Sequence, residues 1–221
     1  MQPLVFLLDV DNTLLDNDRV TADLKAHLMA TLGAAAQSQY WKYFEEIRKQ
    51  LGYADYLGAL QRYRMENPRE PNFLGISSFL LSYPFPTRLF PGALEAIKHL
   101  SQFGPTVVLS DGDVVFQPWK VERSGILAAV QNRVLIYIHK ELELADVEAR
   151  YPAAHYVFVD DKLRLHTAIK KIWGAKVTTI FVRQGHYALD PEIVRSNPPA
   201  DMTIEHIGDL QTFERGQFAA R

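Results

Sequence analysis

The stretch LVFLLDVDNTLL, from Leu4 to Leu15, places an apolar run directly before two aspartates spaced two residues apart. Residues 4–8 are too few and too uniformly apolar to alternate, which is typical of a strand buried on both faces of a parallel sheet. Asp9 and Asp11 follow its carboxyl end, the edge where open α/β sheets bind ligands. Because two close carboxylates repel each other, we expect a bound cation or one protonated carboxyl group there.

Two other interpretations of this stretch are a capping turn and a calcium loop. Asp, Asn and Thr side chains all bond to nearby backbone groups in turns, so a purely structural turn stays open at this point. A calcium loop of the EF-hand type needs glycine at Leu14 and a bidentate acid at Val20. The sequence therefore excludes the calcium loop. Whether the stretch is only a structural turn depends on the residues in the rest of the chain.

Composition narrows the classes of function. The 221 residues are enough for one domain, or for one domain with an insertion. Lys and Arg number 24 against 26 Asp and Glu, so the net charge of -2 favours neither nucleic acid nor an anionic membrane as partner. The absence of cysteine excludes disulfides, thiolate metal sites and a cysteine nucleophile. With neither a signal-peptide pattern nor a membrane-spanning apolar run, we expect a cytoplasmic protein that binds a small molecule.

The chain after Leu15 has helical and not strand character for about seventy residues. Thr21 is expected to cap a helix that ends at Gly33, and Gly52 is expected to end a second helix. That second helix carries one apolar stripe, formed by Tyr40, Phe44, Ile47 and Leu51. Two further helices are expected over residues 53–65 and 73–83, so the segment predicts a small helical bundle inserted after the first strand.

Beyond the insertion the pattern alternates between strands and helices. Pro91 is expected in the first turn of a helix running through Phe103, and Pro118 is expected to start another helix. Short apolar runs predict strands over residues 106–109, 134–138, 156–159 and 177–182, with helices ending near Tyr151 and Trp173. Residues 202–204 and 209–213 are expected to add an edge strand and a short helix. The class predicted is α/β, with a parallel, doubly wound sheet.

Polar groups follow four of these strands. Besides the first acid pair, they are Ser110, Lys140, and Asp160 with Asp161. Parallel topology brings these strand ends together. An acid pair, a hydroxyl, an ammonium and a second acid pair suit phosphoryl transfer, in which cation and lysine neutralise phosphate. Since all the candidate ligands are oxygens, Mg²⁺ is the expected metal and a small phosphate ester is the expected partner.

These residues resemble the four motifs of the haloacid dehalogenase (HAD) superfamily, over nearly the whole chain. DVDNT at 9–13 resembles the DxDxT signature, and Ser110, Lys140 and VDD at 159–161 resemble the second, third and fourth motifs. The resemblance implies a HAD-like Rossmannoid fold of three layers, α/β/α. It further implies a catalytic core of residues 1–16 and 90–221, with residues 17–89 forming an inserted helical cap of the C1 type.

The resemblance also assigns roles to the motif residues. Asp9 is implied as the nucleophile that forms an aspartyl-phosphate, and Asp11 as the general acid and base. Lys140 is implied to hold nucleophile and phosphate together. Thr13 would shape the loop, while Ser110 and the backbone after it, at Asp111 and Gly112, would bind phosphate oxygens. Mg²⁺ would be held by Asp9, Asp160, Asp161 and the main-chain carbonyl of Asp11.

One residue indicates the subtype. Dehalogenases and phosphonatases of this superfamily lack the second aspartate, and its ATPases carry threonine there, so Asp11 favours a Mg²⁺-dependent phosphatase of a small metabolite. A phosphomutase or phosphotransferase is the nearest alternative. A non-catalytic phosphate-sensing or partner-binding module, using the helical insertion as its contact surface, is another. The sequence departs from the family only where Glu141 replaces a frequent proline, and it leaves the oligomeric state open.

Several other side chains are further candidates for a role in the site. The insertion is rich in aromatics and arginines, among them Trp41, Tyr53 and Arg48. Aromatics at helical spacing are usually bundle core, although a cap is also where this family selects the leaving group. His139 and His186 are expected to be packed or exposed rather than catalytic. Lys120 follows the second motif closely enough to reach a substrate, but the start of a helix there needs no such role.

Overall fold

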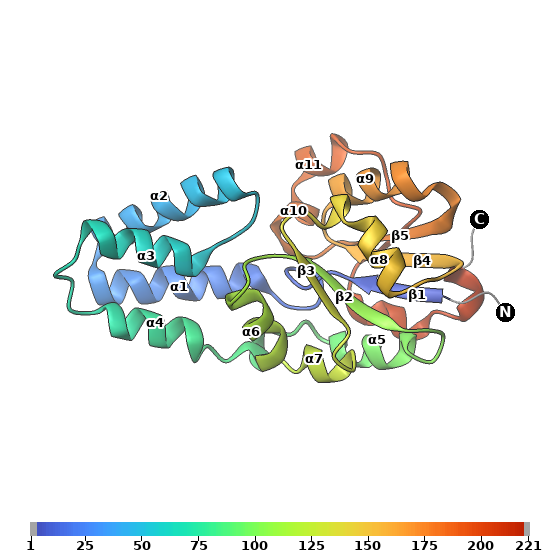
Figure 1. The fold of residues 1–221 in the computed structure, drawn as a ribbon, viewed down its shortest axis with the longest axis horizontal. Helices are drawn as coiled ribbons and strands as arrows, with labels where there is room; N and C mark the ends of the chain where they lie inside the picture. Colours follow the sequence, from blue (N-terminus) through green and yellow to red (C-terminus); the bar gives the residue numbers. More distant parts are fainter. Residues whose placement is uncertain (1–3, 219–221) are drawn as a thin grey trace.

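Six parallel strands form the central sheet of the described chain, residues 4–218 of the computed structural model (Figure 1). Their order across the sheet is β3-β2-β1-β4-β5-β6, so the strand with the first acid pair is central. The predicted α/β class is confirmed. The strands are β1 (Leu4–Leu8), β2 (Thr106–Asp111), β3 (Val134–Tyr137), β4 (His155–Asp160), β5 (Val177–Val182) and β6 (Met202–Ile204).

Helices cover both faces of the sheet because successive strand residues point to opposite sides. In β1, Phe6 and Leu8 belong to one apolar cluster, and Val5 and Leu7 to another. The first cluster includes residues of α5 (Ala93–Leu100), α6 (Phe116–Arg123) and α7 (Ile126–Ala129). The second includes residues of α8 (Leu144–Arg150) and α9 (Leu163–Trp173). Each fully buried Leu or Phe stabilises the fold by about 1.5–3 kcal/mol. The apolar side chains on both faces of the sheet therefore contribute to its stability.

Four helices follow β1 and extend away from the sheet, at the left of Figure 1. They are α1 (Asn17–Leu32), α2 (Ala34–Leu51), α3 (Tyr56–Glu66) and α4 (Phe73–Leu81). Gly33 and Gly52 follow α1 and α2 with positive φ angles of 83° and 85°, as the sequence predicts. The division into core (1–16, 90–221) and cap (17–89) stays a prediction, and residues 1–3 and 219–221 lie outside the described part.

Some predicted helix boundaries are wrong. The first helix begins at Asn17, because the carboxylate of Asp16 caps it by accepting from the N–H of Arg19 at 2.9 Å. Thr21 therefore lies inside α1, and its hydroxyl bonds to that of Tyr56 at 2.8 Å. The helix predicted from Pro91 through Phe103 is shorter, Ala93–Leu100, because Gly92 adopts a positive φ of 80° before it. Pro118 lies in the first turn of α6, which begins at Phe116.

Strand ends and the tail also differ from the prediction. β2 continues to Asp111, because Ser110 and Asp111 pair with Ile136 and Tyr137 of β3. β6 confirms the predicted edge strand, but the helix predicted over 209–213 is the 3-10 turn η4 (Ile207–Thr212). The remaining elements are η1 (Phe85–Arg88), η2 (Lys140–Leu142), η3 (Gly174–Lys176), α10 (Gly185–Leu189), α11 (Pro191–Arg195) and η5 (Arg215–Phe218).

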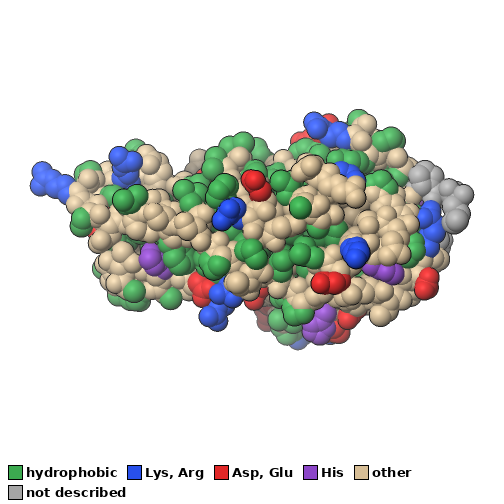
Figure 2. Space-filling model, turned by 90° about the horizontal axis from the view of Figure 1, so that it is seen from below, with side chains coloured by type: hydrophobic (Ala, Val, Ile, Leu, Met, Phe, Trp, Pro, Cys, Tyr) green, Lys and Arg blue, Asp and Glu red, His purple; other side chains and the backbone are tan. Residues whose placement is uncertain are grey.

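Charged side chains of both signs are scattered over the face shown in Figure 2. Within residues 4–218, none of the helices combines the length and apolar character needed to span a bilayer. The expectations that neither nucleic acid nor membrane is a partner, and that the protein is cytoplasmic, stay predictions.

Gln184 is buried just after β5 and connects the loop of the first motif to the 3-10 turn η4. Its amide N–H donates to the carbonyl of Thr13 at 3.2 Å, and its amide oxygen accepts from the N–H of Ile207 at 2.6 Å. Gln184→Leu would leave both backbone groups buried without a partner. We expect it to lower the free energy of unfolding by roughly 2–4 kcal/mol.

Urea unfolding followed by circular dichroism measures this loss. Gln211→Leu is the control, because Gln211 is exposed and bonds only the carbonyl of Gly208. It should cost less than about 0.5 kcal/mol. Equal stabilities of the two variants would contradict the role given to Gln184.

Candidate active site

The loop after β1 carries the first motif and is fixed by its own backbone. The N–H groups of Leu14 and Leu15 both donate to the carbonyl of Val10 at 2.9 Å. Asn12 turns the chain with a positive φ of 61°, a conformation that asparagine tolerates better than most residues. Asp9 donates its N–H to Val159 of β4 at 3.0 Å. The loop is therefore rigid, and it fixes the position of the buried Asp9 at the sheet edge.

Lys140 joins two strand ends from inside the core. Its ammonium lies 2.6 Å from Oδ1 of Asp9 and 2.7 Å from Oδ2 of Asp160, and it donates to the carbonyl of Leu109 at 3.1 Å. All three of its N–H donors therefore have acceptors. Burial by itself lowers the pKa of Lys140, but the charges of Asp160 and Asp9 outweigh burial and hold this pKa above its usual range. Lys140 is a permanent cation at the centre of the site.

Three buried carboxylates gather beside this lysine. Asp9, Asp160 and Asp161 each place a carboxylate oxygen so that the three atoms lie within 4.8 Å of one another. The Oδ2 atom of Asp9 and both carboxylate oxygens of Asp161 are buried without a hydrogen-bond partner among the described residues. A buried carboxylate left so costs several kcal/mol unless it is protonated or binds a cation. The donor set is all oxygen and fits Mg²⁺.

The pKa values of these carboxyl groups diverge. Burial raises the pKa of Asp9 to about 6, with Lys140 opposing and Asp160 adding to the shift. Burial also raises the pKa of Asp161 well above its usual value, because Lys162 only partly compensates it and Asp160 repels it. Burial acts on Asp160 in the same direction, but Lys140 and Lys162 bring its pKa below the usual value. Asp161 is therefore the carboxyl group that most needs a cation.

Ser110 and Asp11 are linked by a glutamine. The hydroxyl of Ser110, at the end of β2, donates to Oδ1 of Asp9 at 3.3 Å. The amide of Gln117 donates to the hydroxyl of Ser110 at 3.0 Å and to Oδ2 of Asp11 at 3.3 Å. Sequence reasoning missed Gln117, although its place in the first turn of the helix after the second motif was a usable signal. Ser110 thus faces the nucleophile predicted at Asp9.

Lys120 holds the other oxygen of Asp11. Its ammonium lies 2.6 Å from Oδ1 of Asp11 and donates to the side-chain oxygen of Asn17 at 3.1 Å. Lys120 is 1% exposed, so it is part of the site and not merely a residue at the start of a helix. The carboxylate of Asp11 lies outside the buried acid cluster. It is held toward the helices, where it could meet a leaving group.

The structure gives less direct support to substrate contacts from the other predicted residues, which are Asp111, Gly112 and Thr13. The carboxylate of Asp111 accepts from the backbone N–H of Lys140 at 2.7 Å, and the N–H of Gly112 donates to Tyr137 at 3.0 Å. A phosphate contact from Gly112 stays a prediction, and its N–H would first have to leave this bond. Thr13 is buried, and its hydroxyl has no partner among the described residues, so its role in shaping the loop also stays a prediction.

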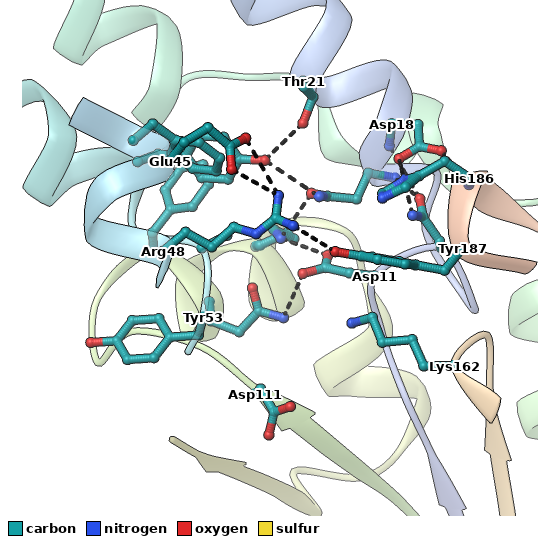
Figure 3. Close-up of a pocket in the computed structure, with 18 of the residues that line it drawn as sticks. Asp11, Asp18, Thr21, Glu45, Arg48, Tyr53, Asp111, Lys162, His186 and Tyr187 are labelled. Atoms are coloured by element: carbon teal, nitrogen blue, oxygen red, sulfur yellow. Dashed lines mark hydrogen bonds and ion pairs between the residues drawn. The ribbon is translucent and has the colours of Figure 1, made fainter. Parts of the chain in front are cut away.

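A cavity of about 490 Å³ lies over these strand ends, between the sheet edge and helices α1, α2 and α3 (Figure 3). Asp11, Gln117 and Lys120 line it from the sheet side, and Trp41, Phe44, Arg48 and Tyr56 from the helices. Tyr40, Tyr43 and Tyr63 are instead buried within the helical bundle. The aromatics of the insertion thus divide between bundle core and cavity wall.

The helical segment approaches the sheet edge at several points. A Cβ atom on Gly52 would come within 2.2 Å of the ring of His139, so glycine permits this approach. Arg48 donates to the hydroxyl of Tyr187 in α10 at 2.8 Å. His186 is exposed and its ring bonds to the carboxylate of Asp18 at 2.6 Å. Neither histidine lies in the acid cluster.

Comparison with known proteins assigns the chain to a family. It is 61% identical to a haloacid dehalogenase-like hydrolase from Burkholderia xenovorans LB400, covering 97% of this chain and 100% of the other, with a TM-score of 0.92. The chain belongs to the haloacid dehalogenase-like hydrolases, as the sequence motifs predict. No family model and no curated protein sequence matches it.

More distant structures share the fold alone. The magnesium-bound HAD-hydrolase YfnB from Bacillus subtilis is 15% identical, with 96% and 100% of the two chains covered and a TM-score of 0.60. An L-2-haloacid dehalogenase from Xanthobacter autotrophicus is 19% identical, with 96% and 97% covered and a TM-score of 0.59. Members with this fold therefore include dehalogenases, and the reaction has to be argued from the residues of the site.

In protein treated with a chelator, replacing Asp160 or Asp161 by asparagine should change the free energy of unfolding in opposite directions. Asp161→Asn removes an unpaired buried charge, so we expect it to raise the free energy of unfolding by roughly 1–2 kcal/mol near neutral pH. Asp160→Asn removes the charge that pairs with Lys140 and should lower that free energy by roughly 3 kcal/mol. Thermal and urea unfolding in chelator measure both values.

The pH dependence gives the sign of each effect. The folded-state pKa of Asp161 lies above its unfolded value, so this residue favours folding below the unfolded pKa and loses that contribution as pH rises through the folded pKa. The gain from Asp161→Asn should therefore grow with pH over this window. The pKa of Asp160 is lowered, so the loss from Asp160→Asn should fade as pH falls through the folded pKa. Parallel pH profiles would contradict this assignment.

Proposed function

We propose that the protein is a Mg²⁺-dependent phosphatase that hydrolyses a small phosphorylated metabolite through Asp9. The observation that carries this proposal is the state of the Asp9 carboxylate. One of its oxygens is held by Lys140 and Ser110, while the other is buried and has no partner among residues 4–218. A carboxylate fixed at one oxygen and bare at the other is oriented for attack.

Asp9, Asp160 and Asp161 would hold the metal, together with the main-chain carbonyl of Asp11. Bound there, Mg²⁺ would neutralise charge on the carboxylates and on the phosphate oxygens. One carboxylate oxygen of Asp9 attacks phosphorus while the other stays with Lys140, which keeps the carboxylate aligned, and the metal would then be held chiefly by Asp160 and Asp161. The hydroxyl of Ser110 would turn from Oδ1 of Asp9 and donate to a phosphate oxygen.

Asp11 moves the protons in both steps. As a general acid it gives a proton to the leaving oxygen, and as a general base it then takes one from the water that attacks the phosphorus of aspartyl-phosphate. Lys120 and Gln117 fix both of its carboxylate oxygens. The presence of Asp11 also supports a phosphate ester as substrate, because by family resemblance the dehalogenases lack this aspartate. The dehalogenase structures resemble this chain in fold alone.

Asp9→Asn removes the attacking oxygen, so we expect no detectable release of phosphate from an aryl phosphate. Chelation of the metal should have the same effect, and added Mg²⁺ should reverse it. The control is Glu95→Gln, the same change at an exposed residue of α5, which should behave as wild type. Near wild-type turnover by Asp9→Asn, or turnover of a 2-haloacid but of no phosphate ester, would refute the proposal.

Asp11→Asn keeps the backbone carbonyl but removes the acid and base. We expect turnover of an unactivated alkyl phosphate to fall by roughly two to four orders of magnitude. With an aryl phosphate the first step should suffer less, because the leaving group needs no proton, so phenolate release should precede phosphate release. Single-turnover kinetics follow both products separately. Equal alkyl phosphatase activity in the variant and the wild type would exclude this role for Asp11.

A further inference from the structure

The acidic side chains that line the cavity all have hydrogen-bonding partners, whereas some of the basic side chains have none among the described residues. Every carboxylate in its wall has a hydrogen-bonding partner, the four pairs being Asp11 with Lys120, Asp18 with His186, Glu45 with Arg48, and Asp111 with the N–H of Lys140. The cations in the wall are Lys25, Arg48, Lys120, Lys162 and Arg164. The cavity thus has spare positive charge and no spare acid within residues 4–218.

Two cations in this wall, Lys25 and Lys162, have ammonium groups without a hydrogen bond or ion pair among the described residues, and Lys25 lies over the ring of Trp41 at 4.3 Å. Lys162 is the one at the sheet edge. It follows Asp161 directly, and its backbone N–H donates to Asp160 at 2.8 Å, so the residue is fixed at the sheet edge. Its ammonium lies 5.2 Å from the ring centre of Tyr187 and has no hydrogen bond or ion pair with any described residue. In Figure 3 it points into the cavity on the side of Asp11. A partly buried ammonium without acceptors favours a bound anion.

Tyr187 and Arg48 complete a donor wall next to Lys162. The hydroxyl of Tyr187 accepts from Arg48 at 2.8 Å, and its own hydrogen has no acceptor among the described residues. Arg48 reaches Glu45 only at 3.4 Å, and both of these side chains are partly exposed. Lys162 and Tyr187 from the sheet side and Arg48 from α2 therefore present N–H and O–H donors to one region of the cavity.

The acid cluster cannot serve as the partner of Lys162 once a cation is bound. The electrostatic attraction on Lys162 comes from Asp161, Asp9 and Asp160, the same carboxylates that would hold the metal. A metal held by these carboxylates would neutralise much of their charge and would leave the ammonium uncompensated. The transferred phosphate would lie beside Asp9, close to the charge of Lys140 and the hydroxyl of Ser110.

We propose that the substrate carries a second anionic group, a carboxylate or phosphate on its leaving group, and that Lys162 and Tyr187 bind it with help from Arg48. The substrate class is then the phosphate monoesters of hydroxy acids or of diols phosphorylated twice. This inference rests on the proposed phosphatase function. Lys162 acts here as a specificity residue, and it does not take part in the bond-making steps.

The test compares matched pairs of esters. Phosphate esters of short hydroxy acids with increasing chain length are each paired with a phosphate ester of a diol of equal length, in which a neutral hydroxyl replaces the carboxylate. We expect the wild type to prefer the acid in kcat/KM by at least about tenfold at one chain length or more, the size of one partly buried ion pair. Lys162→Met should remove most of this preference, and Lys162→Arg should restore part of it.

Two further variants separate specific binding from general charge. Tyr187→Phe keeps the ring but removes the O–H donor, so it should reduce the preference less than Lys162→Met does. Arg164→Gln removes a cavity-lining cation of equal charge that is already paired with Glu141 at 3.1 Å, so it should keep the preference. The ratio between matched esters is the readout, since a merely structural defect lowers activity on both.

Each outcome decides a different question. If the wild type hydrolyses neither member of any pair nor any other phosphate ester, the proposed function fails. If it hydrolyses both members equally at all lengths, the second anionic site is refuted while the phosphatase stands. An equal loss on acid and neutral esters in Lys162→Met would assign the lysine to the transferred phosphate and would also overturn the proposal. If Arg164→Gln also loses the preference, the preference comes from the overall positive charge of the cavity and not from a specific site at Lys162, and the proposal fails.

Discussion

The ammonium of Lys140, enclosed between Asp9 and Asp160, is the interaction on which the rest of the site depends. It joins the ends of β1 and β4 and also bonds to β2, so the three strands are held in one register at the point of reaction. Removing either aspartate would leave the buried ammonium with one counter-charge in place of two, so the three charged groups depend on one another. The same lysine satisfies one oxygen of Asp9 and leaves the other free. The stability of the site and the reactivity that we propose for Asp9 therefore arise from one arrangement.

That arrangement creates a charge imbalance that the fold does not resolve. Lys140 cannot also reach Asp161, whose carboxylate stays buried without a partner among the described residues. The protein tolerates this cost because the loop after β1 and the neighbouring strands fix the three acids in place. A site that is unfavourable when empty binds a hard cation strongly. The electrostatics of the cluster thus favour a metal.

The sequence predicted the residues whose positions follow from strand order. Asp9, Ser110 and Asp160 lie at strand ends and Lys140 follows β3 by three residues, and parallel topology brings such residues together. The start of α1 was predicted wrongly because both Asp16 and Thr21 can cap a helix, and only the packing against Tyr56 distinguishes them.

The residues that were missed lie on helices or loops remote in sequence. Gln117 lies on α6, and the direction of its side chain depends on how that helix is oriented over the sheet. The role of Lys120 was left undecided for the same reason. Tyr187 reaches Arg48 across 139 positions of the chain, a contact that no local pattern indicates. Local patterns therefore predict the residues at the sheet edge better than the helical residues that line the cavity, where we propose that the substrate is selected.

The nucleophilic role of Asp9 is tested most directly by mass spectrometry of the protein during turnover. Wild-type protein is mixed with an aryl phosphate and Mg²⁺, quenched in acid within one turnover, digested and sequenced by fragmentation. The structure leads us to expect one phosphoryl group on the carboxylate of Asp9, absent without substrate and lost on raising the pH. Turnover with an unmodified Asp9, or with the phosphoryl group on another residue, would contradict the account.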